Sequence, residues 1–189
     1  MSRVALVIGL ACGLASGMAL AAPAPPWEVD KAASTVRFTS SMAGEGFSGG
    51  FRRWDVEIRF DPANLAGSSV TARFEVASVT TANPDRDQAL PTSTFFNAPA
   101  FPVATFVAHG FSAMGPGRYQ AAGILTLRGV SRPVTLPFTV AIIGRQARMT
   151  GAVAINRLTF GVGQDEWKAT NAIPAAVTVS MALTARRAP

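Results

Sequence analysis

Cysteine and histidine are almost absent from this chain. Its 189 residues include one cysteine, Cys12, in the apolar stretch at the N-terminus, and one histidine, His109. Without Cys12 the protein has no disulfide, no thiolate nucleophile and no thiolate metal ligand. A lone histidine excludes the HxxxH and HExxH zinc spacings, and no G-x-S-x-G nucleophile elbow occurs. The sequence therefore predicts no metal, no cofactor and no catalytic residue, which favours a protein that is not an enzyme.

Lysine is also scarce. The net charge of +6 at pH 7 is carried almost entirely by arginine, and Lys31 and Lys168 are the only lysines. Guanidinium groups suit phosphate and carboxylate groups, so the chain permits an anionic ligand head group or a transient contact with an acidic membrane surface. The basic residues are scattered singly along the sequence, without a cluster or an aromatic stacking motif. Nucleic acid is therefore not an expected partner.

The longest apolar run lies at the N-terminus. It follows one arginine and ends in the small-residue triplet Ala19-Leu20-Ala21, which is the arrangement of a secretory signal peptide. We expect cleavage after Ala21, because cleavage one residue later would place a proline at the new N-terminus. Residues 1–21 are then a signal peptide, residues 22–26 a Pro/Ala linker, and residues 27–187 one domain that lies in the periplasm or is secreted.

The sequence disfavours two alternatives to cleavage. A retained membrane anchor is disfavoured because Gly9, Gly13 and Gly17 interrupt the apolar run, which then leads directly into prolines. A lipid-modified Cys12 is disfavoured because the leucine expected three residues before such a cysteine is missing.

Alternation of apolar and polar residues dominates the rest of the chain. In the clearest run, residues 54–60, apolar side chains alternate with charged ones, which is typical of a half-buried β-strand. Similar runs, separated by turn residues, begin near residue 36 and cover residues 70–76, 103–113, 118–128, 132–143, 147–156 and 176–186. The pattern predicts an all-β domain of about eight antiparallel strands. Closure into an eight-stranded β-barrel would remove the exposed edges of such a sheet.

The inward positions of the predicted barrel are almost entirely apolar. The phase of the alternation gives the inward set as Phe38, Ile58, Phe60, Phe74, Val76, Phe106, Leu125, Leu127, Leu136, Phe138, Val153, Ile155, Val179 and Met181. An eight-stranded barrel has an interior that side chains can just fill or that holds one small ligand. Alternation alone leaves both open: a dry packed core and a site for an apolar guest.

One segment, residues 83–99, breaks the alternation. Asn83 or Asp85 can cap a short helix there, and we expect this helical segment to form a lid or plug over one end of the barrel. Its aromatic residues either contact a ligand or anchor the plug. The apolar residues of the lid are Leu90, Phe95, Phe96 and Phe101.

Four blocks of the chain carry a family resemblance. They are Trp27–Phe38, with W-x-V-D followed by S-x-V-x-F; Arg86-Asp87 with Phe95-Phe96 and Phe101–Phe106; Gly123–Val134; and Ile155–Gly163, continuing to Glu166-Trp167. In this order and spacing they resemble the YceI-like family of exported polyisoprenoid-binding proteins. The resemblance covers nearly the whole predicted domain. Two departures are Ala89, where many relatives have histidine, and Asn97, where aspartate is common.

The resemblance implies a lipocalin-like antiparallel barrel whose apolar channel takes a long isoprenoid chain or a related lipid. By the same resemblance the inward set lines this channel, and Arg157, Phe160 and Trp167 lie near its mouth. The family offers no catalytic residue to transfer. From the residues alone, Arg157 is either a gatekeeper for a pyrophosphate head group or an outward, solvated arginine.

The leading hypothesis is a periplasmic, non-enzymatic protein that binds a polyisoprenoid or similar long-chain amphiphile for storage, transport or stress protection. The alternatives are a lipid-modifying enzyme and a packed exported stress protein without a ligand. A small outer-membrane barrel needs an apolar outward band, whereas the outward residues Asp55, Glu57 and Arg59 are charged. The oligomeric state stays open, with a homodimer among the options.

Overall fold

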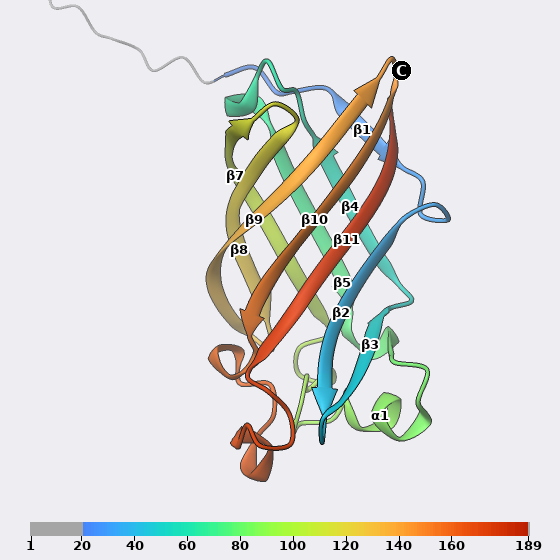
Figure 1. Ribbon diagram of the computed structural model, residues 1–189, viewed down its shortest axis with the longest axis vertical. Coiled ribbons are helices and arrows are strands. Elements are labelled where there is room, and N and C mark those ends of the chain that lie inside the picture. Colours follow the sequence, from blue (N-terminus) through green and yellow to red (C-terminus); the bar gives the residue numbers. More distant parts are fainter. Residues whose placement is uncertain (1–20, 189) are drawn as a thin grey trace, which may run out of the picture.

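The strands of this protein form a tall barrel (Figure 1). The computed structural model describes residues 21–188. Its helical elements are α1 (Pro84–Ala89) and the 3-10 turns η1 (Leu65–Gly67), η2 (Val76–Ser78), η3 (Arg157–Phe160) and η4 (Asp165–Lys168). The strands are β1 (Pro26–Val29), β2 (Thr35–Met42), β3 (Glu45–Phe51), β4 (Trp54–Arg59), β5 (Ser69–Glu75), β6 (Val79–Thr80), β7 (Val103–Gly115), β8 (Arg118–Leu127), β9 (Val130–Ile143), β10 (Gln146–Asn156) and β11 (Ala176–Arg187). In this part of the chain, no helix has the length and apolar character needed to cross a membrane.

Eight of the strands make a closed ring. Hydrogen-bonded neighbours follow the order β1-β4-β5-β7-β8-β9-β10-β11, and β11 pairs back to β1, so this ring has no free edge strand. All of these pairs are antiparallel. The predicted eight-stranded antiparallel barrel is therefore confirmed. β1 and β2 lie one after the other along β11, and β2 continues through β3 to the short β6.

The barrel wall is interrupted between β2 and β4. β1 pairs with β4 only through Pro26 and Trp27, and β2 turns away to pair with β3 from Arg37 onward. As a result, residues 54–57 of β4 pair with β5 on one side and have no strand partner on the other.

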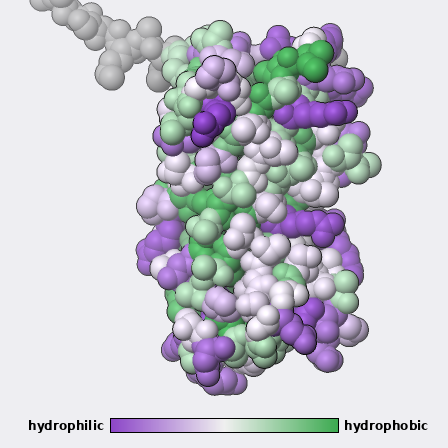
Figure 2. Space-filling view, in the orientation of Figure 1, coloured by the Kyte–Doolittle hydropathy of each residue, from purple (hydrophilic) through white to green (hydrophobic). Residues whose placement is uncertain are grey.

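A second interruption lies between β9 and β10. These strands pair only between Phe138 and Ile143 of β9 and residues 146–151 of β10. The half of β9 that does not pair with β10 contains Pro133 and Pro137. Prolines lack the N–H group that a strand ladder requires. Figure 2, which looks onto this side, shows hydrophobic side chains at mid-height among hydrophilic ones.

A hydrophobic plug fills one end of the barrel. Its short helix α1 is capped by Asn83, whose side-chain oxygen accepts a hydrogen bond from the backbone N–H of Arg86 at 3.0 Å, which confirms the expected cap. The segment around α1 and the loop over residues 157–175 meet beneath the strands (Figure 1). The buried residues of this plug cluster are Val76, Val79, Phe96, Ala98, Ala104, Leu127, Phe160 and Val162.

Asp87 fastens α1 to the strand β6. Its carboxylate accepts hydrogen bonds from the Thr80 hydroxyl at 2.8 Å and from the backbone N–H and hydroxyl of Thr81 at 2.6 and 2.8 Å. Burial alone would raise the pKa of Asp87, but these hydrogen bonds outweigh burial and hold the pKa below its usual value.

Aromatic side chains close the opposite end. The ring of Phe60 lies 5.2 Å from that of Tyr119 and 5.7 Å from that of Phe138, both edge-on, and Phe111 packs against Phe60 and Phe138. The indole N–H of Trp27 donates to the carbonyl of Phe60 at 2.9 Å, so its buried polar atom is satisfied. Residues 22–26, the predicted linker, run beside η1: the Ala22 carbonyl accepts from the Asn64 side chain, and the Ala24 N–H donates to the Gly67 carbonyl, both at 2.8 Å.

Candidate functional site

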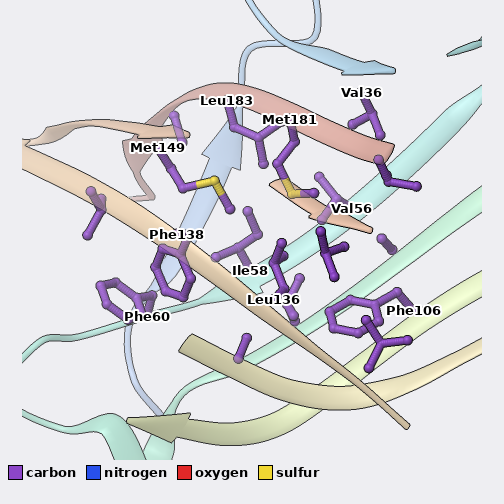
Figure 3. A pocket seen from close by; sticks show the side chains of 18 of the residues that line it. Val36, Val56, Ile58, Phe60, Phe106, Leu136, Phe138, Met149, Met181 and Leu183 are labelled. Carbon is purple, nitrogen blue, oxygen red and sulfur yellow. The ribbon is translucent and has the colours of Figure 1, made fainter. Parts of the chain in front are cut away.

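A cavity occupies the barrel between its two closed ends. Its volume is about 170 Å³. Every lining residue is apolar. Figure 3 shows side chains from several strands pointing into this shared space, with Phe60 and Phe138 together at one end and Phe106 toward the other.

Most of the predicted inward set lines this cavity. The lining members are Ile58, Phe60, Phe74, Phe106, Leu125, Leu136, Phe138, Val153, Ile155, Val179 and Met181. The remaining three belong to the plug instead: Val76 and Leu127 are in the plug cluster, and Phe38 packs against it. These three lie at the plug end, where the loops fill the barrel, and Val76 stands in the turn η2 and not in a strand.

Several lining residues were not in the predicted set. The alternation continues to Val56 and Val36 on the same strands as predicted members, so its phase contains the signal for them. Alanines such as Ala72 are too weakly hydrophobic for the alternation to identify them as lining residues. The added residues are Trp27, Val36, Trp54, Val56, Val70, Ala72, Phe111, Ala121, Val134, Val140, Ala147, Met149, Leu183 and Ala185.

The predicted lid and mouth residues lie in or around the plug, and none of them lines the cavity. Phe96 and Phe160 are buried in the plug cluster, with Leu90 and Phe95 packed against it. The rings of Phe95 and Trp167 lie 5.6 Å apart. The Phe101 ring occupies the space where a Cβ on Gly129 would lie. The lid segment therefore acts as a packed stopper at this end.

Arg157 is buried inside the loop over residues 157–175. It is 5% exposed, so the solvated alternative from the sequence is wrong. Its guanidinium donates to the carbonyls of Pro174 at 3.0 Å, Val162 at 2.8 Å and Ile173 at 2.9 Å, with a longer contact of 3.4 Å to Ala169. Burial lowers the pKa of this guanidinium. Arg157 thus ties one loop together, and its donors are engaged by backbone carbonyls.

The site contains no groups for acid–base or metal chemistry. His109 is exposed on β7, as the strand phase predicts. Across residues 21–188, no three His, Cys, Asp or Glu side chains gather as a metal site requires. The geometry is that of an apolar chamber, in which each buried methylene of a guest would contribute about 0.8 kcal/mol.

A family model described as the YceI-like domain matches residues 27–185. The chain belongs to the YceI-like family. A UPF0312 protein of Vibrio cholerae serotype O1 (strain M66-2) is 29% identical over 163 residues, which cover 84% of this chain and 76% of that protein. A UPF0312 protein of Ectopseudomonas mendocina (strain ymp) is 33% identical over 135 residues, covering 70% of this chain and 68% of the relative.

Solved structures of other bacterial proteins share this barrel. Burkholderia cenocepacia BcnA superposes with a TM-score of 0.80 at 31% identity, covering 83% of this chain and 99% of BcnA. A polyisoprenoid binding domain from Saccharophagus degradans, implicated in plant cell wall breakdown, gives a TM-score of 0.64 at 15% identity, covering 86% of this chain and 98% of that domain. The second likeness shows the fold alone.

Proposed function

We propose that this YceI-like protein is an exported, non-enzymatic binding protein that holds a polyisoprenoid or a similar long-chain amphiphile in its barrel, in the periplasm. The observation that carries the proposal is the cavity itself, which lies between the plug and the aromatic end and is lined by apolar residues alone. Such a chamber offers burial to a hydrocarbon chain and nothing to a small polar metabolite.

The likeness to a polyisoprenoid binding domain supports the same ligand class. Two alternatives are less well supported. A lipid-modifying enzyme needs an acid, base or nucleophile near its substrate, and no lining side chain supplies one. A packed stress protein without a ligand needs a filled interior, whereas the space between the plug and the aromatic end is unfilled.

Transient contact with an anionic membrane surface is also part of this proposal. Met114 and Ile143, 54% and 81% exposed, lie at the β7–β8 and β9–β10 turns, at the end of the barrel opposite α1 (Figure 1). The exposed Arg118 and Arg145 lie in the same turns. Apolar tips beside basic residues suit an acidic lipid surface.

The test of the binding function is extraction of the protein purified from its own host. Organic extraction and mass spectrometry should release a long-chain amphiphile in a stoichiometric amount, and the stripped protein should take up geranylgeraniol in a saturable manner. Absence of a co-purified lipid together with no saturable uptake would refute the proposal.

A further inference from the structure

The cavity provides no partner for the polar end of an amphiphile, because none of its lining residues carries a charged or hydroxyl side chain. Burial of a charged group without partners is strongly unfavourable. A charged head group therefore has to lie outside the cavity while the tail lies inside. The lipid chain that joins the head group to the tail can pass through the barrel wall at its two interruptions.

The two interruptions differ in charge. Along the β9–β10 interruption the exposed residues are mostly neutral. Arg132 is the basic residue on the half of β9 that does not pair with β10. At the interruption between β2 and β4, by contrast, four basic residues lie in neighbouring segments, namely Lys31, Arg37, Arg52 and Arg53. Lys31 and Arg53 form ion pairs with Asp55 and Glu75, whereas Arg37 and Arg52 form none within residues 21–188. An anionic head group is therefore favoured at the interruption between β2 and β4.

A polar hollow lies on the outer wall at the β2–β4 interruption. Arg37 and Arg52 line it, together with the hydroxyl residues Ser34, Ser48, Thr80 and Thr81. Val36 and Trp54 line both this hollow and the cavity. These two shared residues mark where the apolar chamber and the polar hollow adjoin.

The two arginines of the hollow are available to an anion. Among the described residues, neither forms an ion pair within 4 Å. Arg52 donates one hydrogen bond, to the Thr80 hydroxyl at 3.1 Å. The neighbouring acid Asp87 accepts hydrogen bonds from Thr80 and Thr81, and the charge of Arg52 acts on it only as the smallest of several causes that lower its pKa. A guanidinium has five N–H donors in a planar fork, so each arginine retains donors for phosphate or carboxylate oxygens.

Lys31 crosses the interruption from the turn between β1 and β2. Its ammonium lies 2.8 Å from the Asp55 carboxylate of β4 and 5.8 Å from the centre of the Trp54 ring. The side chains of this ion pair are 54% and 58% exposed, and a pair so exposed contributes little to stability. It can separate when a chain passes between the strands.

We propose that the polar hollow is the head-group site, in which Arg37 and Arg52 bind the phosphate, diphosphate or carboxylate of an amphiphile whose tail lies in the cavity. The chain crosses the wall beside Val36 and Trp54. This assignment rests on the lipid-binding function proposed above and adds to it an anionic head group and the residues that hold it.

The test compares ligands with the same tail and different heads. The stripped protein is titrated with geranylgeranyl diphosphate, with geranylgeraniol and with free pyrophosphate, for wild type, R37Q/R52Q and the matched control R132Q/R148Q. The control removes two exposed arginines, one of them at the β9–β10 interruption. Thermal unfolding checks that each variant is folded.

R37Q/R52Q should bind the diphosphate about tenfold or more weakly and bind the alcohol as wild type does. The control should change neither affinity, and free pyrophosphate should not bind saturably at concentrations where the diphosphate does. Equal weakening of the diphosphate and the alcohol, weakening confined to R132Q/R148Q, or tight binding of free pyrophosphate would each overturn the head-group site while leaving lipid binding intact. If wild type binds neither lipid, the proposed function itself fails, and the head-group site fails with it.

Discussion

Replacement of an inward alanine by leucine tests whether the barrel is vacant or packed. The protein offers a matched pair of positions for this test. Ala72 on β5 is 8% exposed and lines the cavity. Ala104 on the neighbouring strand β7 is 4% exposed and belongs to the plug cluster. Both alanines are buried and lie on paired strands, since Ala104 faces Phe74 in the ladder. They differ in whether free space lies in front of the side chain.

The expected magnitudes follow from that difference. A leucine at position 104 forces three extra carbons into a filled cluster, and overpacking of this kind costs about 1–3 kcal/mol. A leucine at position 72 enters free space, so the free energy of unfolding should change by less than about 0.5 kcal/mol. The same three carbons displace about three methylenes of a guest at about 0.8 kcal/mol each, which weakens binding by roughly 60-fold.

Urea unfolding of the stripped protein measures the stabilities, and titration with geranylgeraniol measures the affinities. A104L should lose stability and, where it is folded, keep its affinity. A72L should keep its stability and lose its affinity. If A72L is destabilised as much as A104L, the middle of the barrel is as tightly packed as the plug, and the reasoning for a bound guest is refuted.

The remaining predictions concern stability, membrane contact and processing. R157K should destabilise the protein by about 2 kcal/mol or more in urea unfolding, because an ammonium cannot replace a fork that reaches several carbonyls; an unchanged midpoint would contradict the role of Arg157. Because hydrogen bonds hold the folded pKa of Asp87 below its unfolded value of about 3.9, its contribution is complete above that value and is lost as pH falls through the folded pKa. D87N should therefore lower the thermal midpoint at neutral pH, and its difference from wild type should shrink as pH falls below about 3.9. A difference that stays constant with pH would be the contrary result. M114D/I143D should reduce co-sedimentation with anionic vesicles without changing lipid affinity, and equal sedimentation would count against membrane contact by these turns. Mass spectrometry of the protein from its host should give a mature chain that begins after Ala21.

The alternation of side chains was sufficient to predict the barrel, because one face of nearly every strand is buried and the other is exposed. It missed β3, in which Gly49 stands between Phe47 and Phe51 on the same face of the strand. A Cβ at Gly49 would collide with the ring of Phe38 on the paired strand β2, so the glycine is required by a neighbour that the local sequence does not reveal. Phe51 packs against the plug cluster, but the glycine before it on the same face interrupts the hydrophobic period, so the pattern does not reach the length of a recognisable strand.

The surroundings of Arg157 were beyond the sequence for a different reason. The alternation ends at Asn156, where β10 ends and η3 begins, so strand phase assigns no direction to the next side chain. The carbonyls that Arg157 binds belong to residues 5 to 17 positions later in the chain. Only the folded loop brings them around one guanidinium, and a buried arginine is stable there because its polar atoms are satisfied.

Whether the barrel is vacant depends on side-chain volume and strand length together, and the phase of the alternation reports neither. β7 and β9 span 13 and 14 residues, longer than most strands in globular proteins, so the barrel is tall. The plug reaches into one end because loops carry Phe96 and Phe160 beneath the strands, and aromatic rings close the other end. No plug residue lines the space between these ends, where inward positions such as Ala72 are small. The wall of an eight-stranded barrel cannot contract to compensate, since strand number and tilt fix its diameter. The space therefore persists, and its apolar lining favours a hydrocarbon guest over water.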